Sequence, residues 1–321
     1  MKRKLLVIFI LILFLSFSFY CKKKVAPVKE DISGMLELLP QNAIGVVFVN
    51  VQKISHTEFF DKSIEKEKEK SEKYQQFIKS WGIDPKKDVY YIAIAVTGEK
   101  TVEKKPEAVA IARLSYNKDL IINNLKKEGF EIKEEKYGGM TIFGGVDKKN
   151  KKTKMAFLDK NHIVVGSEGG LKSVIDLYKG KGENIYKNTK LTDLMKDINQ
   201  ASFLWGCFLI PEKALKEATT KNPQAKIFES IESTSFFIDY ENKKYSGQLN
   251  LFSSDETKNK QIVDFLNGIK AMIGMGKAQD PDFQELLGNI NISGGPTGIN
   301  FTVELTEDLL MRLREKSKKE K

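Results

Sequence analysis

The first apolar stretch of the chain lies almost at its beginning. A short basic head, Met1-Lys2-Arg3-Lys4, is followed by a run from Leu5 to Tyr20 whose only polar groups are two serines and one tyrosine hydroxyl. As a helix this run would be roughly 24 Å long, shorter than the ~30 Å hydrocarbon core of a bilayer. A basic head, an apolar run and a defined end are typical of an export signal, which we assign to residues 1–21.

Further along, apolar residues recur with the periods of helices and strands. The clearest helix is predicted from Thr257 to Ile273, where apolar positions counted from Ile262 fall at i, i+3, i+4, i+7, i+10 and i+11. Other helices are expected at residues 57–80, 119–128, 171–178, 191–198, 281–287 and 309–314, and residues 214–231 are expected to form a helical region interrupted near Pro223. Strands are expected at residues 44–51, 90–96, 108–114, 130–136, 140–143, 155–158, 162–166, 202–209, 235–240, 246–252, 289–293 and 298–305.

The same order of elements occurs twice. A strand, a helical stretch, a pair of strands, another helix and further strands fill residues 35–200, and this order restarts over 201–314. An α+β fold is therefore expected, with mainly antiparallel sheets, packed helices and two similar units in tandem. Residue identity between the halves is too low to prove a duplication. Residues 22–34 are predicted to form a tether, and 315–321 a charged tail.

The composition adds little that is unusual. Of 321 residues, 41% are hydrophobic and 30% are charged, as in ordinary globular proteins. The formal net charge is +10, but six positive charges flank the apolar run, which leaves about +4 on the rest of the chain. This excess is too small to indicate nucleic-acid binding, and no nucleic-acid partner is expected.

Cys21 directly follows the apolar run. The residues Ser18-Phe19-Tyr20-Cys21 resemble the lipobox of bacterial lipoproteins. The resemblance implies that the Cys21 thiol is diacylated and becomes the new N-terminus. A lipid anchor would then hold the protein to a membrane, facing the periplasm or the cell exterior. An uncleaved signal anchor and ordinary secretion are the alternatives.

A second resemblance lies just before the first predicted strand. The segment Leu38-Leu39-Pro40-Gln41-Asn42-Ala43 is similar to the opening of uncharacterised bacterial envelope lipoproteins, in which a Leu-Leu-Pro-x-Asn/Asp-Ala element precedes a first strand. This resemblance implies an α+β domain outside the cytoplasm, without an assigned activity.

Few residues are candidates for catalysis. His56 and His162 are the two histidines of the chain, so a His-rich metal site cannot be assembled, and a Ser-His-Asp triad would need one of them. No Gly-x-Ser-x-Gly elbow supplies a nucleophile. Cys207 lies in an apolar run and is expected to pack in the core. No catalytic residue, metal or cofactor is therefore predicted.

Two surface features are candidates for binding. Trp81, Tyr90 and Tyr91 could form an aromatic platform, although core packing is the commoner use of such residues. A predicted hairpin loop carries five lysines that could contact an acidic polysaccharide or lipid headgroups, although such loops are more often simply solvated. These lysines are Lys148, Lys149, Lys151, Lys152 and Lys154.

Together these patterns favour a membrane-anchored envelope lipoprotein of non-catalytic binding or scaffold type. Its partner would be another envelope protein, a glycan or a lipid. One alternative is a carrier of a lipid or other hydrophobic ligand, for which an apolar cavity beneath the helix at 257–273 is expected. Another is a carboxylate-dependent hydrolase, which would need two Asp or Glu side chains converging in one cleft.

Overall fold

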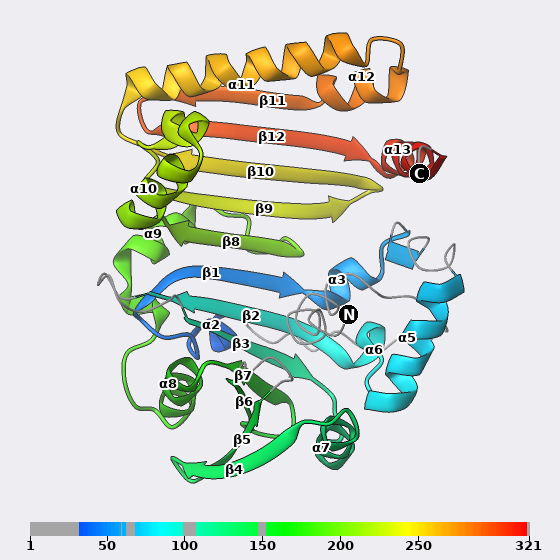
Figure 1. The fold of residues 1–321 in the computed structure, drawn as a ribbon, viewed down its shortest axis with the longest axis vertical. Coiled ribbons are helices and arrows are strands. Elements are labelled where there is room, and N and C mark those ends of the chain that lie inside the picture. The colour runs from blue at the N-terminus through cyan, green and yellow to red at the C-terminus, as the bar shows by residue number, and fades with distance from the viewer. Residues whose placement is uncertain (1–31, 59, 62–67, 99–106, 147–151, 320–321) are drawn as a thin grey trace. The chain divides into compact units, whose positions relative to one another are not determined.

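A computed structural model describes residues 32–58, 60–61, 68–98, 107–146 and 152–319. The chain divides into two compact units, Met1–Thr189 and Lys190–Lys321. Each unit combines an antiparallel sheet with helices, which confirms the predicted α+β class (Figure 1). The division falls earlier in the chain than the expected boundary after residue 200.

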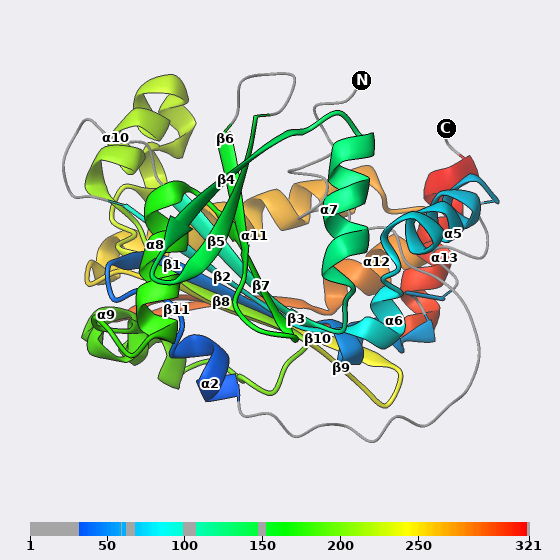
Figure 2. The same cartoon turned by 90° about the horizontal axis from the view of Figure 1, so that it is seen from below.

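The sheet of unit 1 consists of strands β1 (Ala43–Asn50), β2 (Val89–Thr97), β3 (Glu107–Leu114), β4 (Glu131–Tyr137), β5 (Met140–Val146), β6 (Lys152–Phe157) and β7 (His162–Gly166). All neighbours are antiparallel, and the order is β1-β2-β3-β7-β6-β5-β4. Figure 2 shows β4, β5 and β6 at a steep angle to β1, β2 and β3, so the sheet bends.

The helices of unit 1 are α2 (Ile32–Leu36), α3 (Val51–Ser55), α5 (Lys68–Trp81), α6 (Pro85–Asp88), α7 (Lys118–Lys127) and α8 (Glu168–Tyr178), with a 3-10 turn η1 (Ile185–Lys187). Asn117 and Ser167 begin α7 and α8 as N-caps, because their side chains accept hydrogen bonds from the N–H groups of Leu120 and Gly170. Gly129, at φ 83°, takes the left-handed conformation that follows the end of α7.

One face of the unit 1 sheet forms a dry core. Phe48, Ala93, Ile111 and Val164 pair in register across β1, β2, β3 and β7, and each is completely shielded from solvent. Helix α8 covers this face and buries Ile175 against it. Because side chains alternate along a strand, the intervening residues point to the other face, on which α7 lies.

Unit 2 is built around a shorter sheet. Its strands are β8 (Leu204–Leu209), β9 (Ser233–Glu241), β10 (Lys244–Phe252), β11 (Ile290–Gly295) and β12 (Gly298–Thr306), in the order β8-β9-β10-β12-β11. Its helices are α9 (Thr189–Lys196), which begins at the division between the units, α10 (Glu212–Lys221), α11 (Glu256–Gly276), α12 (Pro281–Gly288) and α13 (Glu307–Lys319), with a 3-10 segment η2 (Pro223–Phe228).

Helix α11 supplies the centre of the unit 2 core. Ile262 is completely buried and packs with Ile231 and Ile299, as the apolar spacing along this helix predicts. In both units the first three strands lie in chain order, and the last strand pairs with the third. A duplication of one ancestral unit remains a prediction, since it needs more than a shared order of strands.

The interruption expected near Pro223 is confirmed: α10 ends at Lys221 and a 3-10 segment begins at Pro223, because proline cannot donate the next helical hydrogen bond. Two differences from the predicted elements have a local cause. The short helices α3 and α6 were not predicted; Asn50 and Asp84 cap them with side-chain oxygens. Strand β6 begins at Lys152, within the segment predicted as a lysine-rich loop.

Candidate functional site: an apolar pocket in unit 1

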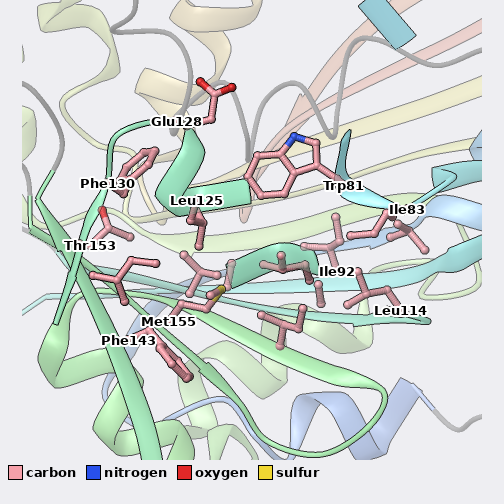
Figure 3. Close-up of a pocket in the computed structure, with 18 of the residues that line it drawn as sticks. Trp81, Ile83, Ile92, Leu114, Leu125, Glu128, Phe130, Phe143, Thr153 and Met155 are labelled. Atoms are coloured by element: carbon pink, nitrogen blue, oxygen red, sulfur yellow. The ribbon is translucent and has the colours of Figure 1, made fainter. Parts of the chain in front are cut away.

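An apolar pocket lies on the α7 side of the unit 1 sheet. It encloses about 140 Å³ between the C-terminal end of α5, helix α7 and the strands beneath them. Figure 3 shows aromatic and aliphatic side chains converging on it from these elements. The labelled apolar lining residues are Trp81, Ile83, Ile92, Leu114, Leu125, Phe130, Phe143 and Met155.

Small residues on two strands explain why this part of the unit is hollow. Strand β3 presents Ala110 and Ala112 to the pocket, while the larger Ile111 points into the dry core. Strand β5 contributes Gly144 and Gly145, which carry no side chain. Methyl groups and hydrogens therefore occupy places where neighbouring strand positions carry isoleucine or phenylalanine.

The wall opposite the sheet is one face of α7. Ile121, Leu125 and Glu128 line the pocket, and their i, i+4, i+7 spacing places them on one side of a helix. Glu128 is the C-cap residue, and its backbone N–H donates to the carbonyls of Asn124 and Lys126. The apolar stripe of α7 thus ends in a carboxylate.

The end of α5 holds Trp81 at the pocket. The Trp81 ring stacks on Phe77, with 6.1 Å between the ring centroids. The Asn124 side-chain amide on α7 donates a 2.6 Å hydrogen bond to the Ser80 carbonyl, which joins the last turn of α5 to α7. Gly82 follows in the left-handed conformation at φ 64° and lets the chain turn away from the helix.

Polar groups lie at the margin of the pocket. Glu128 is the charged residue of the lining, and Thr153 supplies a hydroxyl. Figure 3 shows Glu128 at one edge, with its carboxylate directed away from the apolar side chains. The described part of the chain holds no cluster of three His, Cys, Asp or Glu residues that could bind a metal. What this lining can do chemically is enclose an apolar group.

The volume sets the size of that group. Dry apolar cavities of about 150 Å³ in proteins accept a benzene molecule. The pocket is close to that size, so it holds roughly six carbon atoms of a ring or an alkyl chain. A longer chain would extend through the mouth.

Only some of the residues predicted to contact a membrane or an anionic partner lie in the described part of the chain. Cys21, Lys148, Lys149 and Lys151 lie outside the described residues. Lys152 begins β6, and Lys154 also lies in this strand rather than in a loop. Both of these positions correct the prediction of a five-lysine hairpin loop, because the strand pairs with β5 up to Val146.

The positive charge of Lys154 is paired with carboxylates of unit 1. Its Nζ lies 2.6 Å from Glu135 Oε2 and 2.9 Å from Glu168 Oε2, and its side chain is 14% exposed. Lys172 completes the group, with its Nζ 2.6 Å from Glu168 Oε1. An anionic partner would have to compete with two carboxylates for Lys154.

The two histidines have structural partners. The Asp159 carboxylate lies 2.9 Å from His162 Nδ1 and accepts hydrogen bonds from backbone N–H groups of Asn161 and His162. Burial opposes ionisation of Asp159, but these donors bring its pKa below the usual range. His56 Nδ1 lies 2.6 Å from the Gln52 carbonyl, at the end of α3.

The structure also places Cys207 and the residues of the candidate aromatic platform. Cys207 is completely buried in β8, and burial raises the pKa of its thiol to about 12. Trp81 lines the pocket instead of joining Tyr90 and Tyr91 in a surface platform; Tyr90 lies beneath the Arg113 guanidinium, 5.4 Å from its ring centroid. Sequence reasoning missed the pocket, although the alternation of alanine with larger residues along β3 was visible.

The fold and the pocket define an α+β protein whose first unit has an apolar recess. The chain belongs to the family described as "Protein of unknown function (DUF3352)", whose model matches residues 5–236. No match was found among curated proteins. Among the described residues, no helix is long and apolar enough to cross a bilayer.

Crystal structures of TP0453 are among the solved structures that are similar to this chain. Crystal form I of TP0453 has a TM-score of 0.47 and 11% identity, covering 90% of this chain and 96% of that chain. Crystal form III of TP0453 has a TM-score of 0.47 and 12% identity, covering 90% and 97%.

Proposed function

We propose that this chain is a membrane-anchored binding protein of the bacterial envelope, whose unit 1 pocket holds the apolar part of a lipid-like ligand. The observation that carries this proposal is the pocket, with its apolar lining and its volume of about 140 Å³. Its place differs from the expected one, because it lies under α7 in unit 1 rather than beneath the helix at 257–273.

The lining favours a lipid over a glycan. A sugar presents hydroxyl groups on most of its surface, and each would lose its hydrogen bonds to water on entering an apolar recess. The side chains of Glu128 and Thr153 cannot replace more than a few of them. An alkyl group has no such cost. Burying six methylene groups contributes about 5 kcal/mol to the binding free energy, from which the entropic cost of association is then subtracted.

The anchor rests on the N-terminal pattern. The basic head, the apolar run and Cys21 support export and acylation. Intact mass and detergent partitioning would test this in a bacterium, with a Cys21→Ala variant beside the natural chain. A mature mass that begins at Cys21 and carries a diacylglyceryl group, lost in the variant, is expected. Retention of Met1 in both forms would instead indicate a signal anchor.

Binding is tested with a neutral apolar dye. The chain from Lys22 onward keeps every described residue of both units, and N-phenyl-1-naphthylamine brightens when it leaves water. We expect saturable brightening that Ala112→Leu abolishes, because the larger side chain fills the pocket. Ala108→Leu is the matched control, since Ala108 lies on the same strand and is exposed. Equal brightening in the natural chain and Ala112→Leu would refute binding at this site.

A further inference from the structure

Glu128 stands where the helix pattern calls for an apolar residue. It follows Ile121 and Leu125 on the pocket-facing stripe of α7, at i+7. Local helix energetics do not explain a carboxylate there, because the C-terminal end of a helix carries partial negative charge and favours cations. Glu128 is the C-cap of that same end. The carboxylate is thus placed unfavourably for α7 and directly at the edge of an apolar recess.

The Glu128 carboxylate is also available to a ligand. The side chain is exposed, and no hydrogen bond or ion pair of its carboxylate occurs within the described part of the chain. Lys126 and Lys127 are its charged neighbours on the helix, but successive residues turn by about 100°, so they project to other sides of α7. Glu131 follows on β4, next to the pocket-lining Phe130 and Ile132, and points to the opposite face of the sheet.

Aromatic rings line the same pocket. Trp81 and Phe130 belong to its lining (Figure 3), and the faces of such rings attract ammonium groups, tryptophan most strongly. The edge therefore offers a carboxylate, the negative end of a helix and aromatic rings, and all three favour positive charge. An anionic head would meet repulsion from the first two.

From this arrangement we infer that the pocket takes amphiphiles with a net positive ammonium head, and that Glu128 determines this preference. The inference rests on the proposed function, because it names the ligand class of the same pocket. The alkyl chain enters the recess, and the ammonium group remains at the edge beside Glu128. Single-chain amines fit this description better than zwitterionic lipid heads, whose phosphate would lie near the carboxylate.

The test compares ligands that have the same ten-carbon chain and different head groups. Decylamine, decanol and decanoate would each displace N-phenyl-1-naphthylamine from the chain that starts at Lys22, at pH 7 and below their aggregation concentrations. We expect decylamine to bind about fivefold to thirtyfold more tightly than decanoate, since attraction and repulsion each contribute as a partly exposed ion pair does. Decanol should lie between them.

A Glu128 variant and a matched control test whether the preference for an ammonium head depends on Glu128. Glu128→Gln should bring the decylamine and decanoate affinities closer together and leave the decanol affinity unchanged, whereas Glu131→Gln should alter none of the three. Decyltrimethylammonium should bind more tightly than decylphosphocholine, which carries the same cation plus a phosphate. Equal binding of that pair would overturn the preference for net positive charge and point to a lipid headgroup.

These experiments distinguish a loss of headgroup selection from a loss of binding. If all three decyl compounds displace the dye equally, and Glu128→Gln changes nothing, the pocket binds apolar chains without selecting the head. Tighter binding of decanoate would likewise overturn the inference. If neither decanol nor the dye binds a folded chain, the proposed function itself fails.

Discussion

Ala112 on β3 and Ile163 on β7 face each other in register, and both line the pocket beneath α7. Ile92 on β2 pairs with Ala112 from the other side. A single alanine therefore stands between two isoleucines in the floor of the recess. Because alanine is smaller than isoleucine, it leaves part of the space that a ligand would occupy.

Filling this position should stabilise the protein. Ala112→Leu adds three carbon atoms, which contribute up to about 2 kcal/mol if the hollow accepts them. The expected rise in thermal midpoint is about 2–4 °C by calorimetry. Ala108→Leu, on the exposed part of the strand, should leave the midpoint unchanged. A fall in the midpoint for Ala112→Leu would mean that the floor is already tightly packed.

The charge group on the other face of unit 1 predicts a pH dependence. Hydrogen bonds and charge from Lys172, and then from Lys154, lower the pKa of Glu168 from 4.5 to about 2. A depressed carboxyl pKa stabilises the folded state above the unfolded pKa, and this contribution disappears as pH falls through the folded pKa.

Lys172→Met should therefore lower the thermal midpoint at pH 7, and the difference from the natural chain should vanish near pH 2. Thermal denaturation across this range measures it. Lys187→Met, which removes an exposed lysine elsewhere in unit 1, should cause a smaller change at pH 7. A constant difference at all pH values would show that the Lys172 methylenes, and not its charge, stabilise the unit.

Cys207 should be inert in the folded protein. With a thiol pKa raised to about 12 by burial, only about one thiol in ten thousand is ionised at pH 8. In the chain from Lys22 onward, which lacks Cys21, iodoacetamide should modify Cys207 only after denaturation. Rapid modification under native conditions would show that β8 opens readily.

The fold class was predictable because both periodicities are strong in this sequence. Strands such as β1 and β3 alternate or form β-branched runs, and Ile262 starts an unbroken helical stripe on α11. The short α3 and α6 were not predictable from periodicity, since each is only about one turn long and depends on a capping side chain.

The pocket could not be located from the sequence alone. Its hollow is the sum of small residues on β3 and β5 beneath α7, and a linear pattern does not show that these elements meet. In the sequence, Ala110 and Ala112 look like ordinary strand residues. Only the structure shows that they line the same pocket as Leu125 of α7. Lys154 illustrates the same limit, because its partners Glu135 and Glu168 are distant in sequence.

In the proposed binding mode, an apolar chain enters the pocket beside Trp81. The chain has two tryptophans, and the other, Trp205, is completely buried in unit 2. The most direct measurement is quenching of tryptophan emission by 10-bromodecanol, because a heavy atom quenches only on contact. The natural chain should lose emission along a saturable curve, and Trp81→Phe, which retains Trp205, should lose none. Equal quenching in both proteins, or none in the natural chain, would contradict the assignment of this pocket as a ligand site.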